Sequence, residues 1–259
     1  MFAALTNNKY PSTNFDASKS AKGIWRYLIL LIFLLPMLFT LSAQTYKVNK
    51  YGLKIMDNIE HYRQKASLDP DLALVQLEKA IPQLKTDFVY ATKNNFTHQV
   101  LYFQPSAYLR RPAAAALKKV ATEMQMLGYG LLIYDAYRPY LVTEKMWEVV
   151  PDNRYAANPK HGSGHNRGLS VDLSLYDLKT GAPLEMPTGF DDFTIKAHQD
   201  YDNLPEKVNK NRNLLKKVMV SYGFIPLRTE WWHFSYPSKG KNFDLMDLSF
   251  EALRRGNLK

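Results

Sequence analysis

Cysteine is absent from the 259 residues of this chain. The protein therefore forms no disulfide bond, offers no thiolate ligand to a metal and has no cysteine nucleophile. It also lacks an N-terminal cysteine for a lipid anchor, and the redox state of its compartment leaves no mark on the sequence. Internal repeats and low-complexity blocks are missing too. The composition, 46% hydrophobic and 22% charged, is typical of a globular protein with one sizeable core.

Dense runs of basic residues are missing as well, although the formal net charge is +10. Such a charge would suit a nucleic acid or an anionic surface as partner. The lysines and arginines instead lie in small groups, such as Lys118 with Lys119 and Arg254 with Arg255, and no glycine-aromatic RNA motif accompanies them. We therefore interpret the basic residues as solvated faces and expect no nucleic-acid partner.

One long apolar run is present, and it lies near the N-terminus. Residues 27–41 carry no charge and follow a polar, basic segment, residues 1–22, and then Arg26. A run of about fifteen residues is shorter than the roughly twenty that a membrane span needs. Because the small residues Ser42 and Ala43 follow it, the first 43 residues predict a secretory signal peptide.

The length of the leading polar segment leaves an uncleaved signal anchor as an alternative, and a buried core helix as a third interpretation. The first two outcomes both place the rest of the chain outside the cytoplasm. We expect an exported, periplasmic protein. If the apolar segment is retained, it would anchor the protein in the inner membrane.

Glycine, proline and the spacing of apolar residues divide the rest of the chain. The range 44–87 is predicted to be a linker and an N-terminal helical segment, with a helix from Pro70 to Ile81. Further along, strands are mixed with helices that begin at a proline. The predicted strands are 88–92, 130–137, 169–175 and 229–236; the predicted helices are 112–126, 139–150 and 205–222; an irregular loop covers 184–201, and a polar tail follows residue 236.

The range 169–175 alternates strictly between apolar and polar residues, so one face of this strand would carry Ser170, Asp172 and Ser174. An ionised carboxylate in the middle of such a strand needs a partner that offsets its burial. A metal ion would serve, and so would Arg138 or Arg167. Helices mixed with a few strands of this kind predict an α+β fold with one face of the sheet buried.

Two histidines have acidic companions. His165 precedes Asp172 by seven residues, with Gly168 between them to let the chain turn onto the strand, and Glu230 precedes His233 by three. Together they supply two imidazoles, one carboxylate ligand and a second carboxylate that is free to act as a base. This is the minimum set of protein groups for a zinc hydrolase.

Two features of this constellation stay open in the sequence. His161 lies four residues before His165 and could take its place as ligand. Glu230 and His233 are three residues apart, a step that brings side chains together on a helix but sends them to opposite faces of a regular strand. The aromatic residues around them favour a strand. The two side chains can therefore meet only if Glu230 lies at the start of the strand or a bulge intervenes.

Two motifs around these residues closely resemble those of the zinc D,D-peptidases, namely Ser163-x-His165-x-x-Gly168-x-Ser-x-Asp172 and Glu230-x-Trp232-His233. Tyr137-Arg138-Pro139 and the order of elements narrow the resemblance to the D-alanyl-D-alanine dipeptidases of the vancomycin-resistance type. The resemblance covers roughly residues 88–236. The chain departs from it at Gly164, where a serine is common, and at Ser170, where an alanine is common.

The resemblance implies a hedgehog/D,D-peptidase-like α+β fold with a small, mainly antiparallel sheet flanked by helices, and a catalytic domain over residues 88–259. It also implies one zinc ion, with His165, Asp172 and His233 as its ligands.

The same resemblance implies roles for four further residues. Glu230 matches the catalytic base, and Arg138 matches the arginine that stabilises the transition state. Ser163 matches a residue associated with the substrate carboxylate, and Asp191 matches one associated with the substrate amine.

The function implied is zinc-dependent hydrolysis of the D-Ala-D-Ala dipeptide by metal-activated water, linked to the metabolism of cell-wall peptidoglycan. One alternative is an exported D,D-carboxypeptidase acting on muropeptide stems, which would need an open groove in place of a closed pocket. A second is a non-catalytic, zinc-containing wall-binding module. Loss of Glu230 or Arg138 would be the signature of such a module, and both are present.

Overall fold

Residues 46–256, which the computed structural model describes, alternate between short strands and helices. The strands are β1 (Lys47–Val48), β2 (Lys54–Met56), β3 (Leu74–Gln76), β4 (Lys85–Thr86), β5 (Tyr108–Arg110), β6 (Tyr129–Asp135), β7 (Ser170–Asp177), β8 (Ile225–Pro226), β9 (His233–Ser235) and β10 (Leu245–Met246). The α-helices are α2 (Ile59–Leu68), α3 (Leu77–Ala80), α4 (Arg111–Met126), α5 (Tyr140–Val149), α6 (Glu206–Ser221) and α7 (Phe250–Gly256). The 3₁₀ helices are η2 (Pro70–Leu72), η3 (Val89–Ala91), η4 (His165–Arg167) and η5 (Ile195–Ala197).

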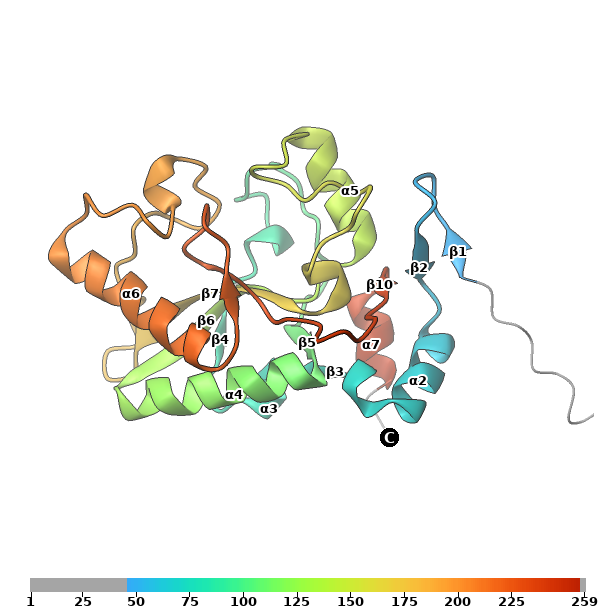
Figure 1. Cartoon of the computed structure of the whole chain (residues 1–259), viewed down its shortest axis with the longest axis horizontal. Helices are drawn as coiled ribbons and strands as arrows, with labels where there is room; N and C mark the ends of the chain where they lie inside the picture. The colour runs from blue at the N-terminus through green and yellow to red at the C-terminus, as the bar shows by residue number, and fades with distance from the viewer. Residues whose placement is uncertain (1–45, 257–259) are drawn as a thin grey trace, which may run out of the picture. The chain divides into compact units, whose positions relative to one another are not determined.

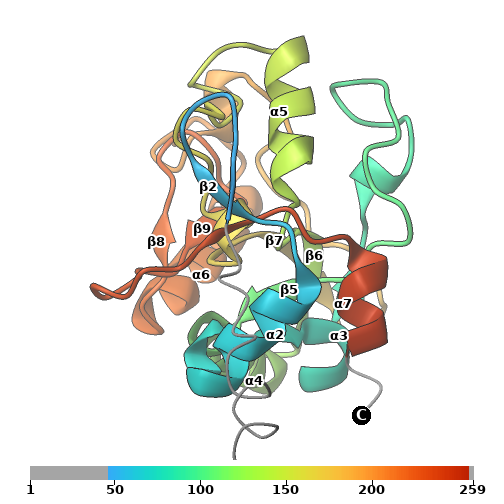
Figure 2. The same cartoon turned by 90° about the vertical axis from the view of Figure 1, so that its right-hand side faces the viewer.

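Strand β7 lies at the centre of a five-stranded sheet with the order β4-β6-β7-β9-β8. Each neighbouring pair is antiparallel except β4 with β6. Helix α4 lies below this sheet and helix α5 lies above it in both cartoon views (Figures 1 and 2). The prediction of an α+β fold with a small, mainly antiparallel sheet flanked by helices is therefore confirmed.

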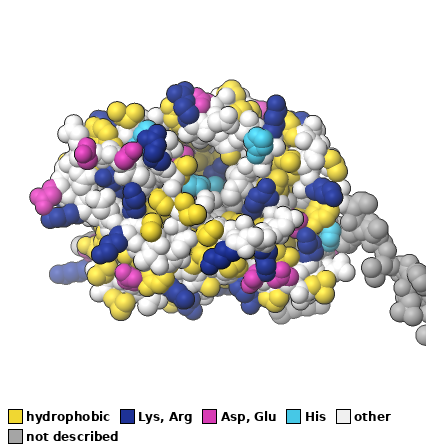
Figure 3. All heavy atoms as spheres, in the orientation of Figure 1, with side chains coloured by type: hydrophobic (Ala, Val, Ile, Leu, Met, Phe, Trp, Pro, Cys, Tyr) yellow, Lys and Arg dark blue, Asp and Glu magenta, His cyan; other side chains and the backbone are white. Residues whose placement is uncertain are grey.

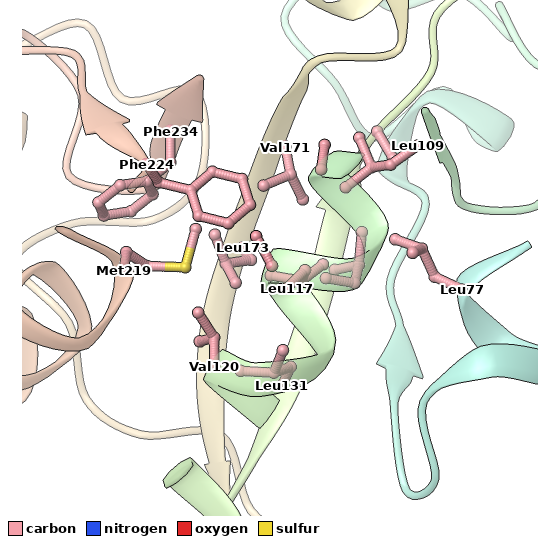
Figure 4. Packing of buried hydrophobic residues seen from close by; sticks show 14 of the residues in the cluster. Leu77, Leu109, Leu117, Val120, Leu131, Val171, Leu173, Met219, Phe224 and Phe234 are labelled. Carbon is pink, nitrogen blue, oxygen red and sulfur yellow. The ribbon is translucent and has the colours of Figure 1, made fainter. Parts of the chain in front are cut away.

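The alternation along β7 separates its side chains as predicted. Val171 and Leu173 are fully buried on one face, where they pack with Leu117 of α4 and Met219 of α6 (Figure 4). Burying one such side chain contributes about 1.5–3 kcal/mol to stability. Asp172 points to the opposite face and is also buried, at 3% exposure. The carboxylate is thus held rigidly by a strand whose other side forms the main core.

Helix α4 follows the prediction closely. Pro112 lies in its first turn, where the missing N–H leaves no hydrogen bond unmade. Ala113 and Ala116 are buried, and their small side chains let the helix pack close to its neighbours. The chain leaves the helix through Gly128, whose φ of +88° is a conformation that favours glycine.

The range 46–87 belongs to the same compact unit as the rest of the described chain. Strand β2 pairs with β10, β3 pairs with β5, and β4 pairs with β6. Strands from the range predicted as a linker and an N-terminal helical segment therefore pair with strands formed by later residues.

The single helix predicted from Pro70 to Ile81 is wrong. The structure has η2, β3 and α3 in succession. The residues of β3 pair with β5 in antiparallel register, so pairing with a distant strand overrides the helical spacing of the apolar residues. Leu77 and Ile81 are nevertheless buried, as that spacing required.

The strand predicted over 88–92 is also wrong, because this range forms η3. Tyr90 turns inward there and is 1% exposed. The range after residue 236, predicted as a polar tail, contains β10 and α7. Met246 and Phe250 are buried in a second core that includes Tyr62 of α2. Helices α2 and α7 accordingly lie side by side although they are far apart in sequence (Figures 1 and 2).

The predicted signal peptide or signal anchor, residues 1–43, lies outside the described residues. Among residues 46–256, no helix combines the length and the apolar character that crossing a membrane requires.

Candidate metal centre and active site

Three side chains from separate elements converge on the polar side of the five-stranded sheet. Asp172 comes from β7, His233 opens β9, and His165 opens η4. Asp172 and His233 face each other in the β7–β9 register. One ligand atom from each of the three residues lies within 4.8 Å of the others, and no other such group occurs in the part of the chain that the structure describes.

Hydrogen bonds to the outer nitrogens orient both imidazoles. Nδ1 of His165 lies 2.7 Å from the carbonyl oxygen of Ala136, to which it donates. Its Nε2 faces the other two residues, 3.3 Å from Oδ2 of Asp172 and 3.2 Å from Nδ1 of His233. Nε2 of His233 contacts the hydroxyl of Ser235 at 3.1 Å. Each ring thus turns one nitrogen toward the shared centre and is oriented through the other, as is usual for metal-ligating histidines.

The chemistry of this donor set fits zinc. Two imidazole nitrogens and one carboxylate oxygen are a common set of protein ligands in catalytic zinc sites. Burial on its own would raise the pKa of Asp172, but the neighbouring His165 and His233 together lower it by more than burial raises it. The pKa of Asp172 is therefore below its usual value. The carboxylate is therefore kept ionised in a place where a bound cation would offset its burial.

The structure decides between the alternatives that the sequence left open for the metal ligands and for the partner of Asp172. His161 is exposed and lies outside the ligand group. Arg167 donates to the carbonyl oxygen of Phe243 and not to Asp172. Arg138 does approach Asp172, with Nη2 3.8 Å from Oδ2. The predicted metal ligands are therefore brought together, with an arginine beside them.

Gly168 lets the chain pass from η4 to β7. Its φ is +69°, and a Cβ atom there would lie 2.8 Å from Cδ2 of Leu74. Both the backbone conformation and the lack of space favour glycine. The turn predicted between His165 and Asp172 is present for these reasons.

Glu230 lies just outside β9, which begins only at His233. The intervening Trp231 and Trp232 form a bend and are 1% exposed each. Oε2 of Glu230 therefore reaches within 3.7 Å of Nδ1 of His233. The two side chains meet because Glu230 precedes the strand, which is one of the two arrangements that the sequence required for a shared site. Burial raises the pKa of Glu230 to about 7, with Asp172 adding to the increase.

Arg138 follows β6 and is 7% exposed. Its Nε and Nη2 lie 2.8 and 2.7 Å from Oδ2 of Asp135. Asp135 is in turn held by Tyr102, whose hydroxyl donates to Oδ1 at 2.8 Å. Burial would lower the pKa of Arg138, but Asp135 and the other nearby groups raise it overall. The guanidinium is therefore a permanent charge with a fixed orientation.

Asp191 lies in the long loop before η5, in the left-handed region with a φ of +60°. A non-glycine residue in this conformation costs on the order of 1–3 kcal/mol. The hydroxyl of Tyr90 lies 3.1 and 2.9 Å from the two carboxylate oxygens and donates to them. Burial raises the pKa of Asp191 to about 7, Tyr90 lowers it and Asp172 raises it.

Ser163 precedes the ligand His165 in a loop that Asn166 holds in place. The Ser163 N–H donates to Oδ1 of Asn166 at 2.9 Å, and the Asn166 N–H donates to Oγ of Ser163 at 3.1 Å. Nδ2 of Asn166 also donates to the carbonyl oxygen of Arg138 at 2.9 Å and to Oγ1 of Thr143 at 2.8 Å. Asn166 is fully buried. It therefore ties the serine loop to the arginine.

A cavity of about 440 Å³ brings these groups together. All seven residues singled out from the sequence line it: Arg138, Ser163, His165, Asp172, Asp191, Glu230 and His233. On the face shown in Figure 3, histidine side chains are visible at the bottom of a hollow. The volume is in the range of small-molecule sites.

Four residues of this site escaped the sequence reasoning: Tyr90, Asp135, Asn166 and Ser235. Asp135 carried a signal, because an acidic residue at the end of an apolar strand needs a partner and Arg138 follows three residues later. Ser235 carried a weaker signal, because residues two apart on a strand share a face and His233 lies two residues before it. Tyr90 carried none, because its partner Asp191 is distant in sequence.

The fold and the site define a metallopeptidase-like hydrolase. The cavity combines three convergent ligands for a divalent metal, a buried carboxylate that can exchange protons near neutral pH, and a fixed cation.

A comparison with models of protein families identifies the family of this chain. The model described as D-ala-D-ala dipeptidase matches residues 71–251. This protein therefore belongs to the D-Ala-D-Ala dipeptidase family of metallopeptidases, as the motifs predicted.

Individual relatives agree. The chain is 37% identical over 164 residues to the D-alanyl-D-alanine dipeptidase of Escherichia coli, covering 63% of this chain and 84% of that protein. It is 30% identical over 192 residues to the D-alanyl-D-alanine dipeptidase of Enterococcus faecalis, covering 64% and 95%. Solved structures that align with it include the LdcB LD-carboxypeptidase (TM-score 0.38, 20% identity, 77% of this chain and 88% of that one). VanYB in complex with D-Alanine-D-Alanine aligns with a TM-score of 0.35 and 15% identity, covering 52% and 75%.

Proposed function

We propose that this protein hydrolyses the D-Ala-D-Ala dipeptide with one zinc ion held by His165, Asp172 and His233. The observation that carries the proposal is the position of Glu230, whose carboxylate lies 3.7 Å from Nδ1 of His233 while its pKa is raised by burial to about 7. A structural metal site has no need of a buried carboxylate that is not itself a ligand.

Glu230 has the properties of a general base and acid. When bound, zinc would lower the pKa of a water ligand to about 7 and polarise the substrate carbonyl. Glu230 accepts a proton from the attacking water as the new C–O bond forms. It then donates this proton to the departing amine as the C–N bond breaks. A pKa near 7 suits both transfers, because the group can be found in either form at neutral pH.

Arg138 stabilises the negative charge that develops on the carbonyl oxygen. Its guanidinium lines the cavity and approaches Asp172, and Asp135 fixes its orientation. A cation that is already oriented needs no reorganisation when charge develops, which is the main advantage of such groups in water-excluded sites.

The two ends of the dipeptide have candidate partners in the same cavity. Asp191 would bind the substrate amine, since its carboxylate is held by Tyr90 and lines the cavity. Ser163 would bind the substrate carboxylate from another loop that lines the cavity, where Asn166 fixes its hydroxyl. The presence of both groups in one small cavity favours a short substrate with both ends free.

The proposal is tested with the purified full chain. We expect about one zinc ion per chain and release of D-alanine from D-Ala-D-Ala but not of L-alanine from L-Ala-L-Ala. Activity should disappear with a chelator and return when zinc is added. A chain that binds no zinc, or that is active with the metal removed, would contradict the proposal. Faster cleavage of a pentapeptide stem than of the free dipeptide would instead support a D,D-carboxypeptidase.

We also propose that the protein is exported to the periplasm, on the basis of the basic segment and apolar run in residues 1–43. An inner-membrane anchor follows if the run is retained. Fractionation of cells that produce a C-terminally tagged chain, with N-terminal sequencing of the product, checks both statements. Recovery of the intact chain in the cytoplasm would overturn them.

A further inference from the structure

The proposed ligand His233 is supported by two serines to which the sequence assigned no role. Its outer nitrogen, Nε2, lies 3.1 Å from Oγ of Ser235. Oγ of Ser235 lies 2.7 Å from Oγ of Ser170. The two serines are directly opposite each other in the β7–β9 register, two residues along each strand from the pair formed by Asp172 and His233 and on the same face. The same two strands therefore carry two of the three proposed ligands and the serines beside them.

The direction of these hydrogen bonds follows from the geometry. Nδ1 of His233 points into the ligand group, 2.8 Å from Oδ1 of Asp172, and must be unprotonated to bind a metal. The ring proton then sits on Nε2, which donates to Oγ of Ser235. The hydroxyl of Ser235 is left free to donate to Ser170. Ser170 is fully buried and Ser235 is partly buried, and both line the cavity together with the three proposed ligands.

Gly164 completes the arrangement. A Cβ atom at this position would lie 2.0 Å from Oγ of Ser170, 3.2 Å from its Cβ and 3.5 Å from Oγ of Ser235. The hydroxyl of Ser170 thus occupies the space that a side chain at position 164 would need. Gly164 directly precedes the ligand His165, so a shift there would move the second imidazole as well. The two positions at which the chain departs from its resemblance are therefore in contact.

We propose that Ser235 and Ser170 form a hydroxyl relay that fixes the orientation and tautomer of His233, and that Gly164 is a glycine because the relay fills its side-chain space. Ser235 and Ser170 are positioning residues, since they act on the metal through the imidazole. The inference rests on the proposed zinc site. It adds that the affinity of this site is set by serines on the two strands that carry Asp172 and His233.

The first test measures the affinity of the full chain for zinc by competition with a chelating dye. Ser235→Ala should weaken binding about 10- to 100-fold, the usual effect of removing a partner of a ligating histidine. Ser170→Ala should weaken it less, because Ser235 still accepts from the ring. Ser235→Thr, which retains the hydroxyl and suits a strand, should restore the affinity. Ser174→Ala is the matched control, because Ser174 is a buried serine on β7 that is hydrogen-bonded to none of the three ligands.

Absorption of the cobalt-substituted protein gives a readout that general destabilisation does not change. The ligand-field bands should shift in Ser235→Ala and keep their wild-type positions in Ser235→Thr and Ser174→Ala. Equal zinc affinity and unchanged bands in Ser235→Ala would overturn the inference. Equal losses in Ser235→Ala and Ser235→Thr would overturn it too, because they would assign the effect to packing.

The second test is a double-mutant cycle between positions 164 and 170. Gly164→Ala alone should weaken zinc binding and lower the melting temperature, because the new Cβ meets Oγ of Ser170. Adding Ser170→Ala removes that oxygen, and most of the loss should be recovered. Equal losses from Gly164→Ala in both backgrounds would overturn the coupling. If the wild-type chain binds no zinc, the proposed function fails together with the inference. If the wild-type chain binds zinc but the serine and glycine variants do not show the expected changes, only the inference fails.

Discussion

The carboxylate of Glu230 and the imidazole of His233 meet at 3.7 Å although they are three residues apart on a segment rich in strand-forming residues. They meet because β9 begins only at His233, and the preceding Trp231 and Trp232 bend into the core. The irregular start of a strand thus places the proposed base beside a proposed metal ligand, while Glu230 itself stays outside the group formed by His165, Asp172 and His233.

Glu230→Gln separates catalysis from metal binding. The amide keeps the shape of the side chain but cannot accept the proton, so we expect kcat to fall by about 10²–10⁴-fold or more. Zinc content, measured by elemental analysis, should stay at the wild-type level. His233→Ala should show the opposite pattern, with loss of zinc and of activity together. Near wild-type turnover in Glu230→Gln would remove Glu230 from the role of base.

Arg138→Lys tests stabilisation of the transition state. Lysine retains the charge but cannot reproduce the contacts of both Nε and Nη2 with Asp135, so the cation loses its fixed orientation. We expect kcat to fall by about a hundredfold with a smaller change in KM. Circular dichroism serves as the control for folding. An increase in KM with unchanged kcat would make Arg138 a binder of the ground state.

Asp191 should make the stability of the metal-free protein depend on pH. Its pKa is raised from 3.8 to about 7, mainly by burial, so the folded state holds a proton that the unfolded state has already lost. The contribution is therefore fully present below pH about 4 and is lost as the pH rises to about 7. Chemical denaturation across this range should show stability falling with pH, and Asp191→Asn should flatten the decrease.

Asp192→Asn is the matched control for this experiment. Its carboxylate accepts a hydrogen bond from the exposed N–H of Thr194 at 2.7 Å. Asp192→Asn should therefore leave the decrease of stability with rising pH unchanged. A decrease of the same size in Asp191→Asn would show that other groups cause it.

Asn166→Ala should loosen the serine loop from the arginine. The substitution removes hydrogen bonds to Ser163, Arg138 and Thr143 at a fully buried position. We expect the free energy of unfolding to fall by about 1–3 kcal/mol and kcat/KM to fall as well. Asn211 lies on α6 and does not line the cavity. Asn211→Ala removes a hydrogen bond to the carbonyl oxygen of Glu185 and should affect stability alone. Unchanged kcat/KM in Asn166→Ala would limit Asn166 to a structural role.

Local patterns were enough to predict several parts of the molecule. The alternation in 169–175 placed Asp172 opposite the core, and the proline and glycine at the two ends of α4 defined that helix. The ligand motif identified the three residues that converge. These predictions succeeded because neighbours along the chain dominate strand alternation and helix termini, and because metal ligands must be of particular residue types.

Other parts depended on residues that are distant in sequence. Strand β3 pairs with β5, and this pairing broke the helix expected from Pro70 to Ile81. Helix α7 packs on α2, which turned an expected polar tail into part of a core. Single-sequence periodicity carries no information about such partners.

The sequence by itself determined which groups could do the chemistry: two imidazoles, two carboxylates and an arginine, with an alternating strand to hold one of them. Only the tertiary structure decided how they act. It bent the chain before His233 so that Glu230 could approach, paired Arg138 with Asp135, and set Ser235 and Ser170 behind the imidazole. The physical reason is that both properties depend on the surroundings of each side chain. Burial raises the pKa of Glu230, and hydrogen bonds to residues that are distant in sequence orient the side chains; only the fold provides either.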